Sequence, residues 1–216
     1  MSAALGTRPG LAERAAKHLR REPPGFLEPR CDLKGDHALN PSTWASLPEA
    51  QPRHAAVLVP IVEHEDGACV LLTERASGLR NHSGQIAFPG GRMDPEDETA
   101  IDTALREAEE EIGLPRTYVS PLGYLDAYLS SSNYFVLPVV ALVRPGAPLL
   151  PNPEEVADVF EVPLSFLMEE ANHELHARHW RGALRQYYAM PFGRRYIWGV
   201  TAGILRNMYE RLYAHD

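Results

Sequence analysis

The sequence predicts an α/β fold in which a mixed β-sheet is covered by helices on both faces, an α/β/α sandwich. Three observations support this. Apolar, β-branched runs typical of buried strands are interleaved with amphipathic segments, two long helices are expected at residues 98–112 and 196–212, and no internal repeat or low-complexity tract is present. The 216 residues suffice for one sizeable domain with its own core.

Residues 1–53 are expected to form a helix and an irregular arm that pack on a domain spanning residues 54–216. An amphipathic helix is predicted from about Leu11 to Arg20, and Pro23-Pro24-Gly25 ends it. Repeated prolines between Phe26 and Arg53 predict an irregular surface segment. Its role is open between a contact in a homodimer and a cover over a functional site.

A β-hairpin is predicted at the start of the domain. Residues 54–63 (HAAVLVPIVE) and 68–74 (ACVLLTE) are apolar runs separated by a short polar turn. Pro89-Gly90-Gly91 then breaks the chain. A helix is predicted over residues 98–112, because apolar residues recur there at helical spacing and Gly113 follows as a stop signal.

The second half of the domain is predicted to contain more strands and a terminal helix. The expected elements are strands at 118–128 and 134–143, an acidic loop at 151–155, a short helix at 163–170, two strands within 173–190 joined near Arg181-Gly182, and the helix at 196–212. Strands interleaved with two main helices indicate a mixed sheet covered on both faces.

Charge and composition restrict the partners. The formal net charge is −8, which disfavours duplex nucleic acid and means that a polyanionic substrate would need metal or local arginines. No apolar run approaches the ~18–20 residues that span a bilayer, so no membrane partner is expected. Cys31 and Cys69 lack metal-ligand spacing. We interpret them as free thiols in a reducing compartment and expect a cytoplasmic protein.

The most informative segment is Arg106–Leu114 (REAEEEIGL), which places four glutamates in two turns of the predicted helix. Like charges three and four positions apart repel, and no lysine follows at i+4 to pair with them. A divalent cation would relieve the repulsion, since hard cations such as Mg²⁺ prefer oxygen ligands. At ~100° per residue, Glu107, Glu110 and Glu111 fall within an arc of about 100°, roughly opposite the apolar face, whereas Glu109 points elsewhere.

We therefore interpret Glu107, Glu110 and Glu111 as a metal site, with an exposed acidic face as the alternative. The glycine pair Gly90 and Gly91 just upstream supports this interpretation. Glycine lets backbone approach a ligand closely, so these amides are candidates for binding a phosphate. A tight turn is the alternative explanation of the pair.

Several of these residues resemble the Nudix box, G-x5-E-x7-R-E-U-x-E-E-x-G-U, in which U is a bulky apolar residue. The matching positions are Glu98, Arg106-Glu107, Glu110-Glu111 and Gly113-Leu114. Two positions depart from the pattern: the box glycine would fall on Arg92, one residue after Gly91, and Ala108 is small for its U position. The resemblance implies a Nudix-type α/β/α sandwich that hydrolyses a nucleoside diphosphate linked to another group.

The resemblance also implies roles for the box residues. Glu107 and Glu111 would be the principal ligands of Mg²⁺ or Mn²⁺, and Glu110 would be a further ligand or a base for water. Arg106 would hold a glutamate of the box in place. The candidate catalytic residues are therefore Glu110, Arg106 and Glu107, in agreement with the general chemistry of metal-assisted hydrolysis and carboxylate bases.

A second motif resembles the upstream signature of coenzyme A diphosphatases, L-L-T-x-R-[SA]-x3-R-x3-G-x3-F-P-G-G. It is carried by Leu71–Ala76, Leu79-Arg80, His82, Gly84-Gln85 and Phe88–Gly91, and Ile197–Ala202 resembles the closing segment of that subfamily. The resemblance implies cleavage of coenzyme A to phosphopantetheine and adenosine 3',5'-bisphosphate. Arg75, Arg80 and His82 are candidates for contacting substrate phosphates, with a solvated side chain or a turn residue as the alternative.

Other functions stay open at this point. A Nudix hydrolase acting on ADP-ribose, a dinucleotide or a damaged nucleotide would carry the same box, because the box binds the diphosphate common to all of them. A catalytically silent nucleotide-binding module is less favoured, since no helix carboxylate of the box is missing. Glu154 and Glu155 are expected to be solvated in their loop, with an additional metal carboxylate as the alternative. The expected partner is a small molecule.

Overall fold

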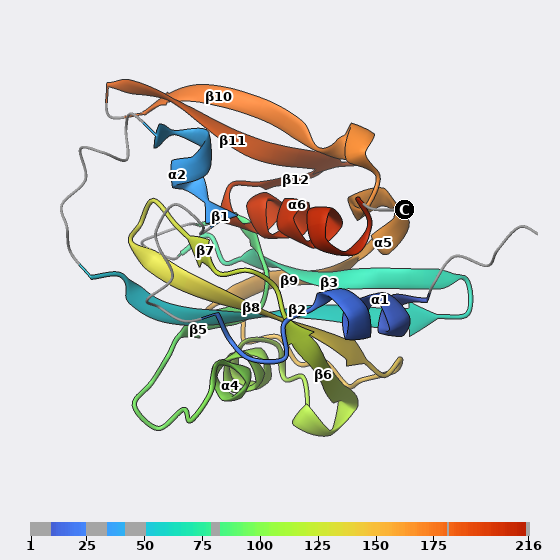
Figure 1. Cartoon of the computed structure of the whole chain (residues 1–216). Coiled ribbons are helices and arrows are strands. Elements are labelled where there is room, and N and C mark those ends of the chain that lie inside the picture. Colours follow the sequence, from blue (N-terminus) through green and yellow to red (C-terminus); the bar gives the residue numbers. More distant parts are fainter. Residues whose placement is uncertain (1–9, 25–33, 42–50, 79–82, 181, 215–216) are drawn as a thin grey trace, which may run out of the picture.

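A computed structural model describes residues 10–24, 34–41, 51–78, 83–180 and 182–214. Within them the chain forms a nine-stranded mixed sheet and a separate three-stranded sheet (Figure 1). The helices are α1 (Leu11–His18), α2 (Asp36–Leu39), α4 (Ala100–Ile112), α5 (Leu164–Leu167) and α6 (Val200–Leu212), with short 3₁₀ turns at Arg116–Tyr118 and Glu170–Asn172.

The large sheet is organised around strand β2 (Arg53–His64). It pairs in parallel with β8 (Tyr134–Val143) and antiparallel with β3 (Gly67–Arg75), which gives the predicted hairpin with Ile61 opposite Val70. Six further strands complete this sheet. They are β1 (Lys34–Gly35), β4 (Ile86–Ala87), β5 (Gly90–Arg92), β6 (Val119–Tyr124), β7 (Tyr128–Leu129) and β9 (Val156–Pro163).

Strand β2 is buried on both faces, as a central strand must be. Ala55, Val59 and Ile61 join one apolar cluster with side chains of α1 and α6. Ala56 and Leu58 join a second cluster with side chains of α4. Successive residues of a strand point to opposite faces, so the two clusters are the two cores of a sandwich. The predicted α/β/α architecture is confirmed.

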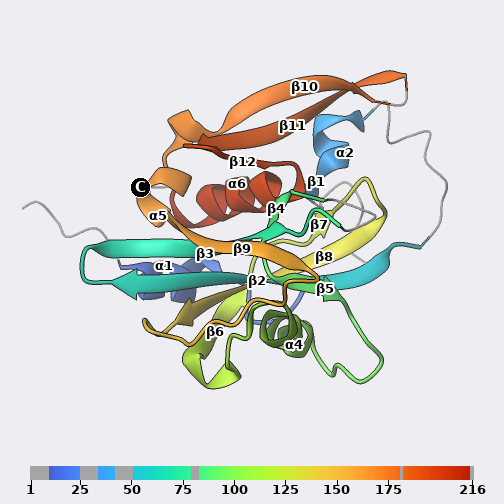
Figure 2. The same ribbon diagram turned by 180° about the vertical axis from the view of Figure 1, so that it is seen from behind.

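The second sheet consists of β10 (Glu174–Trp180), β11 (Ala183–Phe192) and β12 (Arg195–Trp198), all antiparallel. Both views show α6 between this small sheet and the large one (Figures 1 and 2). Met190 of β11 and Ile197 of β12 are fully buried, in the same cluster as the apolar face of α6. The small sheet is therefore anchored to the domain through this helix.

The described parts of the N-terminal region also contact the domain. Leu11, Ala15 and Leu19 of the α1 segment are buried. The Arg14 guanidinium donates a hydrogen bond of 2.9 Å to the carbonyl of Leu212 at the end of α6. No helix in the described ranges is long and apolar enough to cross a membrane.

Three secondary-structure predictions need correction. Residues 156–163 form β9, which pairs with β3; an edge strand of this kind was not predicted because its polar residues mask the apolar alternation. The terminal helix begins at Val200, because residues 195–198 pair with β11 as β12. The strand expected at 118–128 ends at Tyr124 after an irregularity in its pairing.

Candidate active site

The site is built on helix α4 and the short strand β5 beside it. The Thr99 hydroxyl accepts a hydrogen bond from the backbone N–H of Asp102, and the Asp102 carboxylate accepts one from the backbone N–H of Thr99, which fixes the start of the helix. Gly113, with a φ of 65°, ends it in the left-handed conformation that glycine favours. Both ends of the acidic helix are thus set by local sequence.

Glu107 and Glu111 face strand β5. The Glu111 carboxylate accepts a hydrogen bond of 3.1 Å from the backbone N–H of Gly90. A Cβ atom at Gly91 would collide with the carboxylate of Glu107, so a larger residue there would displace this carboxylate from its present position. Gly90 and Gly91, predicted to break the chain and to be candidates for binding a phosphate, belong to strand β5 and lie against these two glutamates.

The predicted orientation of Glu111 is wrong. The helical wheel placed it opposite the buried face, yet only 4% of the residue is exposed. The wheel identifies residues on one side of a helix but not what packs there, and here β5 covers that side. Glu110 keeps the expected exposure, with 56% of its side chain accessible.

Burial raises the pKa of both carboxylates on this face. Burial raises the pKa of Glu111 to about 7, although the Gly90 amide and the Arg75 charge act in the opposite direction. Burial likewise raises the pKa of Glu107, in opposition to its pairing with Arg106. A bound cation would favour the ionised form of both groups.

Glu155 also affects the pKa values of these two carboxylates. Its negative charge acts on both Glu107 and Glu111 and raises their pKa values further. The residue is half-buried and accepts a hydrogen bond of 3.2 Å from the Asn152 side chain. The expectation of a solvated loop fits Glu154, which is exposed, but not Glu155.

Arg106 forms hydrogen bonds to several carboxylates of the site. It donates to both carboxylate oxygens of Asp97, at 3.0 and 2.8 Å, and also to Glu107 at 2.9 Å and Glu110 at 3.1 Å. The Asp97 side chain is 6% exposed, whereas Glu98 is exposed. The acidic partner upstream of the helix is therefore Asp97 and not Glu98.

This assignment explains the irregular glycine spacing. Asp97 lies six residues after Gly91, the interval that the box pattern gives between its glycine and its first acid. The extra residue lies between Asp97 and Arg106 instead of before the first acid. Counting from the glycine as well as from the arginine would have revealed this candidate in the sequence.

Of the three residues predicted to contact substrate phosphates, the structure describes one, Arg75. Arg75 lies on β3, with its Nη1 atom 3.7 Å from a carboxylate oxygen of Glu111. Its Nε atom is buried and has no hydrogen-bond partner among the residues that the structure describes. Arg80 and His82 lie outside the described residues.

A cavity of about 980 Å³ opens beside β5 and extends to the small sheet. Gly90, Gly91 and Arg75 line it, as do side chains that the sequence did not single out. Its charged lining, within the described chain, comprises Arg53, Arg75, Arg92, Arg178, Arg185 and Asp36. A chain with a net charge of −8 thus concentrates five arginines around one cavity. Such a lining attracts polyanions.

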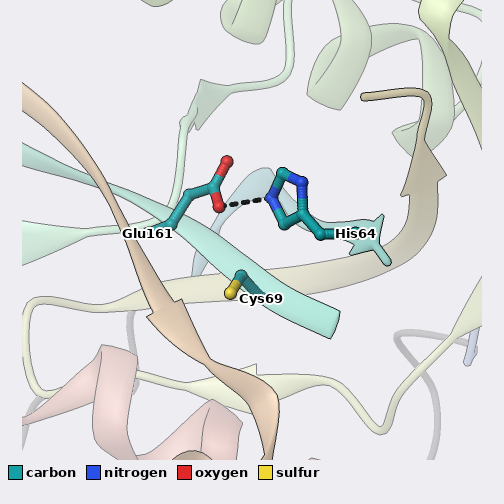
Figure 3. A group of neighbouring side chains, drawn as sticks. All are labelled: His64, Cys69 and Glu161. Carbon is teal, nitrogen blue, oxygen red and sulfur yellow. Dashed lines mark hydrogen bonds and ion pairs between the residues drawn. The ribbon is translucent and has the colours of Figure 1, made fainter. Parts of the chain in front are cut away.

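A separate group of candidate ligands lies at the turn end of the β2–β3 hairpin (Figure 3). His64 and Glu161 form a hydrogen bond of 2.6 Å, and Cys69 lies beside them. Burial and the Glu161 charge raise the pKa of the Cys69 thiol, which opposes the thiolate that a metal would need. We assign no metal to this group. Cys69 is a free thiol, as predicted, whereas Cys31 lies outside the described residues.

Comparison with known proteins bears on this site. A family model of the NUDIX domain matches residues 52–184. The chain is 42% identical over 177 residues to an uncharacterised Nudix hydrolase, NudL, of Yersinia pestis, with 82% of this chain and 87% of that protein covered. NudL of Yersinia pseudotuberculosis gives the same figures. A crystal structure of a Nudix hydrolase from M. smegmatis, RenU, aligns at 25% identity and a TM-score of 0.45 over 53% of this chain and 72% of that one.

Proposed function

Because this chain belongs to the Nudix hydrolase family, which acts on diphosphate bonds of small molecules, we propose that it is a metal-dependent coenzyme A diphosphatase. It would cleave the diphosphate of coenzyme A, or of a coenzyme A derivative, to phosphopantetheine and adenosine 3',5'-bisphosphate. The family alone supports a diphosphatase of this general kind. The choice of coenzyme A needs a further observation.

That observation is the location of the segment from Leu71 to Gly91, whose sequence resembles the coenzyme A diphosphatase signature. Its described ends lie on β3 and β5, and Arg75, Gly90 and Gly91 from it line the large cavity. Trp198 and Gly199, from the second matching segment, line the same cavity. Two motifs more than a hundred residues apart therefore meet at one surface, which supports a shared ligand.

The residues of α4 suit a hard divalent cation, as Nudix hydrolases generally require. Glu107 and Glu111 offer carboxylate oxygens one helical turn apart, and burial raises the pKa of both, which a bound cation would offset. Glu110 is a third donor on the exposed edge. We propose Mg²⁺ or Mn²⁺ held by these three residues. When bound, the ion would neutralise charge on the diphosphate and help ionise the attacking water.

The chain's own residues would do the remaining work. The Arg106 guanidinium fixes Glu107 and Glu110 through hydrogen bonds, so the carboxylates are preorganised before substrate arrives. Glu110, as the most exposed of the three, is placed to accept a proton from water. Arg75 reaches the cavity beside Glu111 and would bind a phosphate oxygen once the substrate displaces that contact.

A substrate panel tests the proposal. The purified protein would be assayed with Mg²⁺ or Mn²⁺ against coenzyme A, ADP-ribose, a diadenosine polyphosphate and an oxidised nucleoside triphosphate, with products resolved by chromatography. We expect coenzyme A to give the highest kcat/KM. Much faster turnover of ADP-ribose would replace the narrow assignment by the general one. Absence of hydrolysis in both the native protein and Glu111→Gln would favour a binding module.

A further inference from the structure

One wall of the cavity comes from the N-terminal part of the chain. Asp36 is the first residue of α2 and Asn40 is the residue directly after it, and both line the cavity. Both views show α2 between the β10–β11 hairpin and the short strands β1 and β7 (Figures 1 and 2). The α2 segment, residues 36–40, therefore lies between the small sheet and the large sheet at the cavity.

Asp36 attaches this segment to the large sheet. Its carboxylate accepts a hydrogen bond of 2.7 Å from the Tyr128 hydroxyl and one of 2.8 Å from the backbone N–H of Ser131. Tyr128 is buried in the core, and burial together with the Asp36 charge raises its pKa. The hydroxyl therefore keeps its proton at neutral pH and remains a donor to the carboxylate.

Asn40 attaches the same segment to the small sheet. Its side-chain amide pairs with the backbone of Gln186 in β11: the Gln186 N–H donates to Oδ1 at 2.7 Å, and Nδ2 donates to the Gln186 carbonyl at 2.9 Å. The same Nδ2 atom donates to the backbone carbonyl of Asp36 at 2.8 Å, which orients the amide. One side chain thus connects the backbone of α2 with that of β11.

This pairing continues the small sheet beyond the end of β12. Strand β12 ends at Trp198, and the N–H of Gly199 then donates to the Tyr188 carbonyl at 3.1 Å. Alternate residues of a strand direct their backbone groups to the same neighbour, so Gln186 and Tyr188 both direct theirs to the β12 side. At Gln186, Asn40 supplies the donor and the acceptor that a longer β12 would supply.

We infer that Asp36 and Asn40 are positioning residues for the substrate. They hold the small-sheet wall of the cavity, which includes Arg178, Gln186 and Tyr187, at a fixed place relative to the large sheet. The affinity for the part of the substrate that extends beyond its diphosphate depends on this placement. A wall that is held before the ligand arrives avoids the entropy cost of ordering it on binding. The inference rests on the proposed function for the identity of the substrate, coenzyme A.

Steady-state kinetics of Asn40→Ala tests the positioning role. The variant removes both hydrogen bonds to Gln186, so we expect KM for coenzyme A to rise about two- to tenfold while kcat stays close to the native value. Inorganic diphosphate lacks the extended part of the substrate, so its inhibition constant should not change. An unchanged KM, or a fall in kcat as large as the rise in KM, would overturn the inference.

Asp36→Ala separates positioning from charge. Removing a negative charge from a cavity that takes a polyanion should by itself strengthen binding. Removing the acceptor of Tyr128 and Ser131 releases the segment from the large sheet, which should weaken binding. We expect the second effect to decide, with a higher KM for coenzyme A as in Asn40→Ala. A KM that is unchanged or lower would overturn the role of Asp36.

Asn172 provides a matched control. Its side chain also donates to a backbone carbonyl, that of Phe166 at 2.9 Å, and it is half-buried but does not line the cavity. Asn172→Ala should therefore leave KM for coenzyme A at the native value. An equal rise in KM for Asn172→Ala and Asn40→Ala would show a general effect of lost side-chain hydrogen bonds and would overturn the inference.

Binding measurements separate this inference from the proposed reaction. Calorimetry on the metal-free protein would compare coenzyme A with inorganic diphosphate. We expect coenzyme A to bind about two- to tenfold more weakly to Asn40→Ala than to the native protein, and inorganic diphosphate to bind both alike. If this holds while coenzyme A is not cleaved, the positioning role stands and the proposed reaction fails. If coenzyme A is cleaved but its affinity and KM are the same in both proteins, the positioning role fails alone.

Discussion

Replacing Asp97 by asparagine tests which acid holds the arginine of the box. Asp97→Asn keeps the shape of the side chain but removes its charge, and Glu98→Gln makes the equivalent change one residue later. The structure predicts a large effect for the first and almost none for the second. Asp97 meets Arg106 through two hydrogen bonds with 6% of its side chain exposed, whereas Glu98 is exposed.

The magnitude follows from the contacts. Each hydrogen bond to a charged group contributes about 1.5–3 kcal/mol. Asparagine retains one acceptor oxygen and turns an amide N–H toward Arg106, so one bond is lost and the other is weakened. Arg106 keeps Glu107 and Glu110 as partners, which limits the loss. We expect about 2–4 kcal/mol for Asp97→Asn, and about 0.5 kcal/mol or less for Glu98→Gln as for surface sites in general.

The pH dependence provides an independent check. Hydrogen bonds from Arg106 hold the pKa of the Asp97 carboxyl well below its usual range. A depressed carboxyl pKa stabilises the native state above the unfolded pKa of about 3.9, and the contribution disappears as pH falls through the native value. Urea unfolding at pH 7 should therefore separate native protein from Asp97→Asn, and the difference should shrink in acid. Equal losses for Asp97→Asn and Glu98→Gln at pH 7 would refute the assignment.

Three further predictions concern the site and its support. Glu111→Gln should lower hydrolysis by at least about a hundredfold, as for loss of a metal-site group. Burial raises the pKa of Glu111 to about 7, so the substitution removes a buried charge above that pH and should stabilise the metal-free protein there. Lower stability of the variant in EDTA at pH 8 would contradict this. Gly91→Ala should displace the Glu107 carboxylate and reduce turnover at least tenfold in a standard rate assay. Gly78 has open space around it, so Gly78→Ala should leave turnover unchanged. Burial raises the pKa of the Asp126 carboxyl, but hydrogen bonds and nearby arginines outweigh burial and leave the pKa lowered. Asp126→Asn should therefore destabilise the fold at pH 7, and less so below pH 4, in urea unfolding. A loss of stability that grows in acid would contradict this.

The extent of the acidic helix could be predicted because its signals are local. Apolar spacing set its length, Gly113 ended it, and the observed bounds differ from the expected ones by two residues at the start. The β2–β3 hairpin was predictable for the same reason, as two apolar runs joined by a short turn. Patterns within about fifteen residues carry this information, since periodicity depends only on neighbours.

The contacts between segments could not be predicted in this way. Whether Asp97 or Glu98 meets Arg106 depends on the path of the loop, which closes through a hydrogen bond from the backbone N–H of Asp97 to the Asp94 carbonyl. The burial of Glu111 depends on β5, a strand of three residues that exists because β2 offers it a partner. Short strands have little pattern of their own, so tertiary pairing decides them.

The pairing of Arg178 with Arg185 was predictable from the sequence, but the surface that they line was not. A hairpin turning near residues 181 and 182 pairs 178 with 185 by counting alone, and the sequence predicted that hairpin. What the sequence did not show is that the pair lines the same cavity as Gly90. Gly90 lines the cavity and also donates its backbone N–H to Glu111, so the arginine-lined wall and the acidic helix meet at β5. The metal that we propose on the glutamates would therefore lie close to the arginine-lined wall, and a diphosphate bound at β5 would contact both.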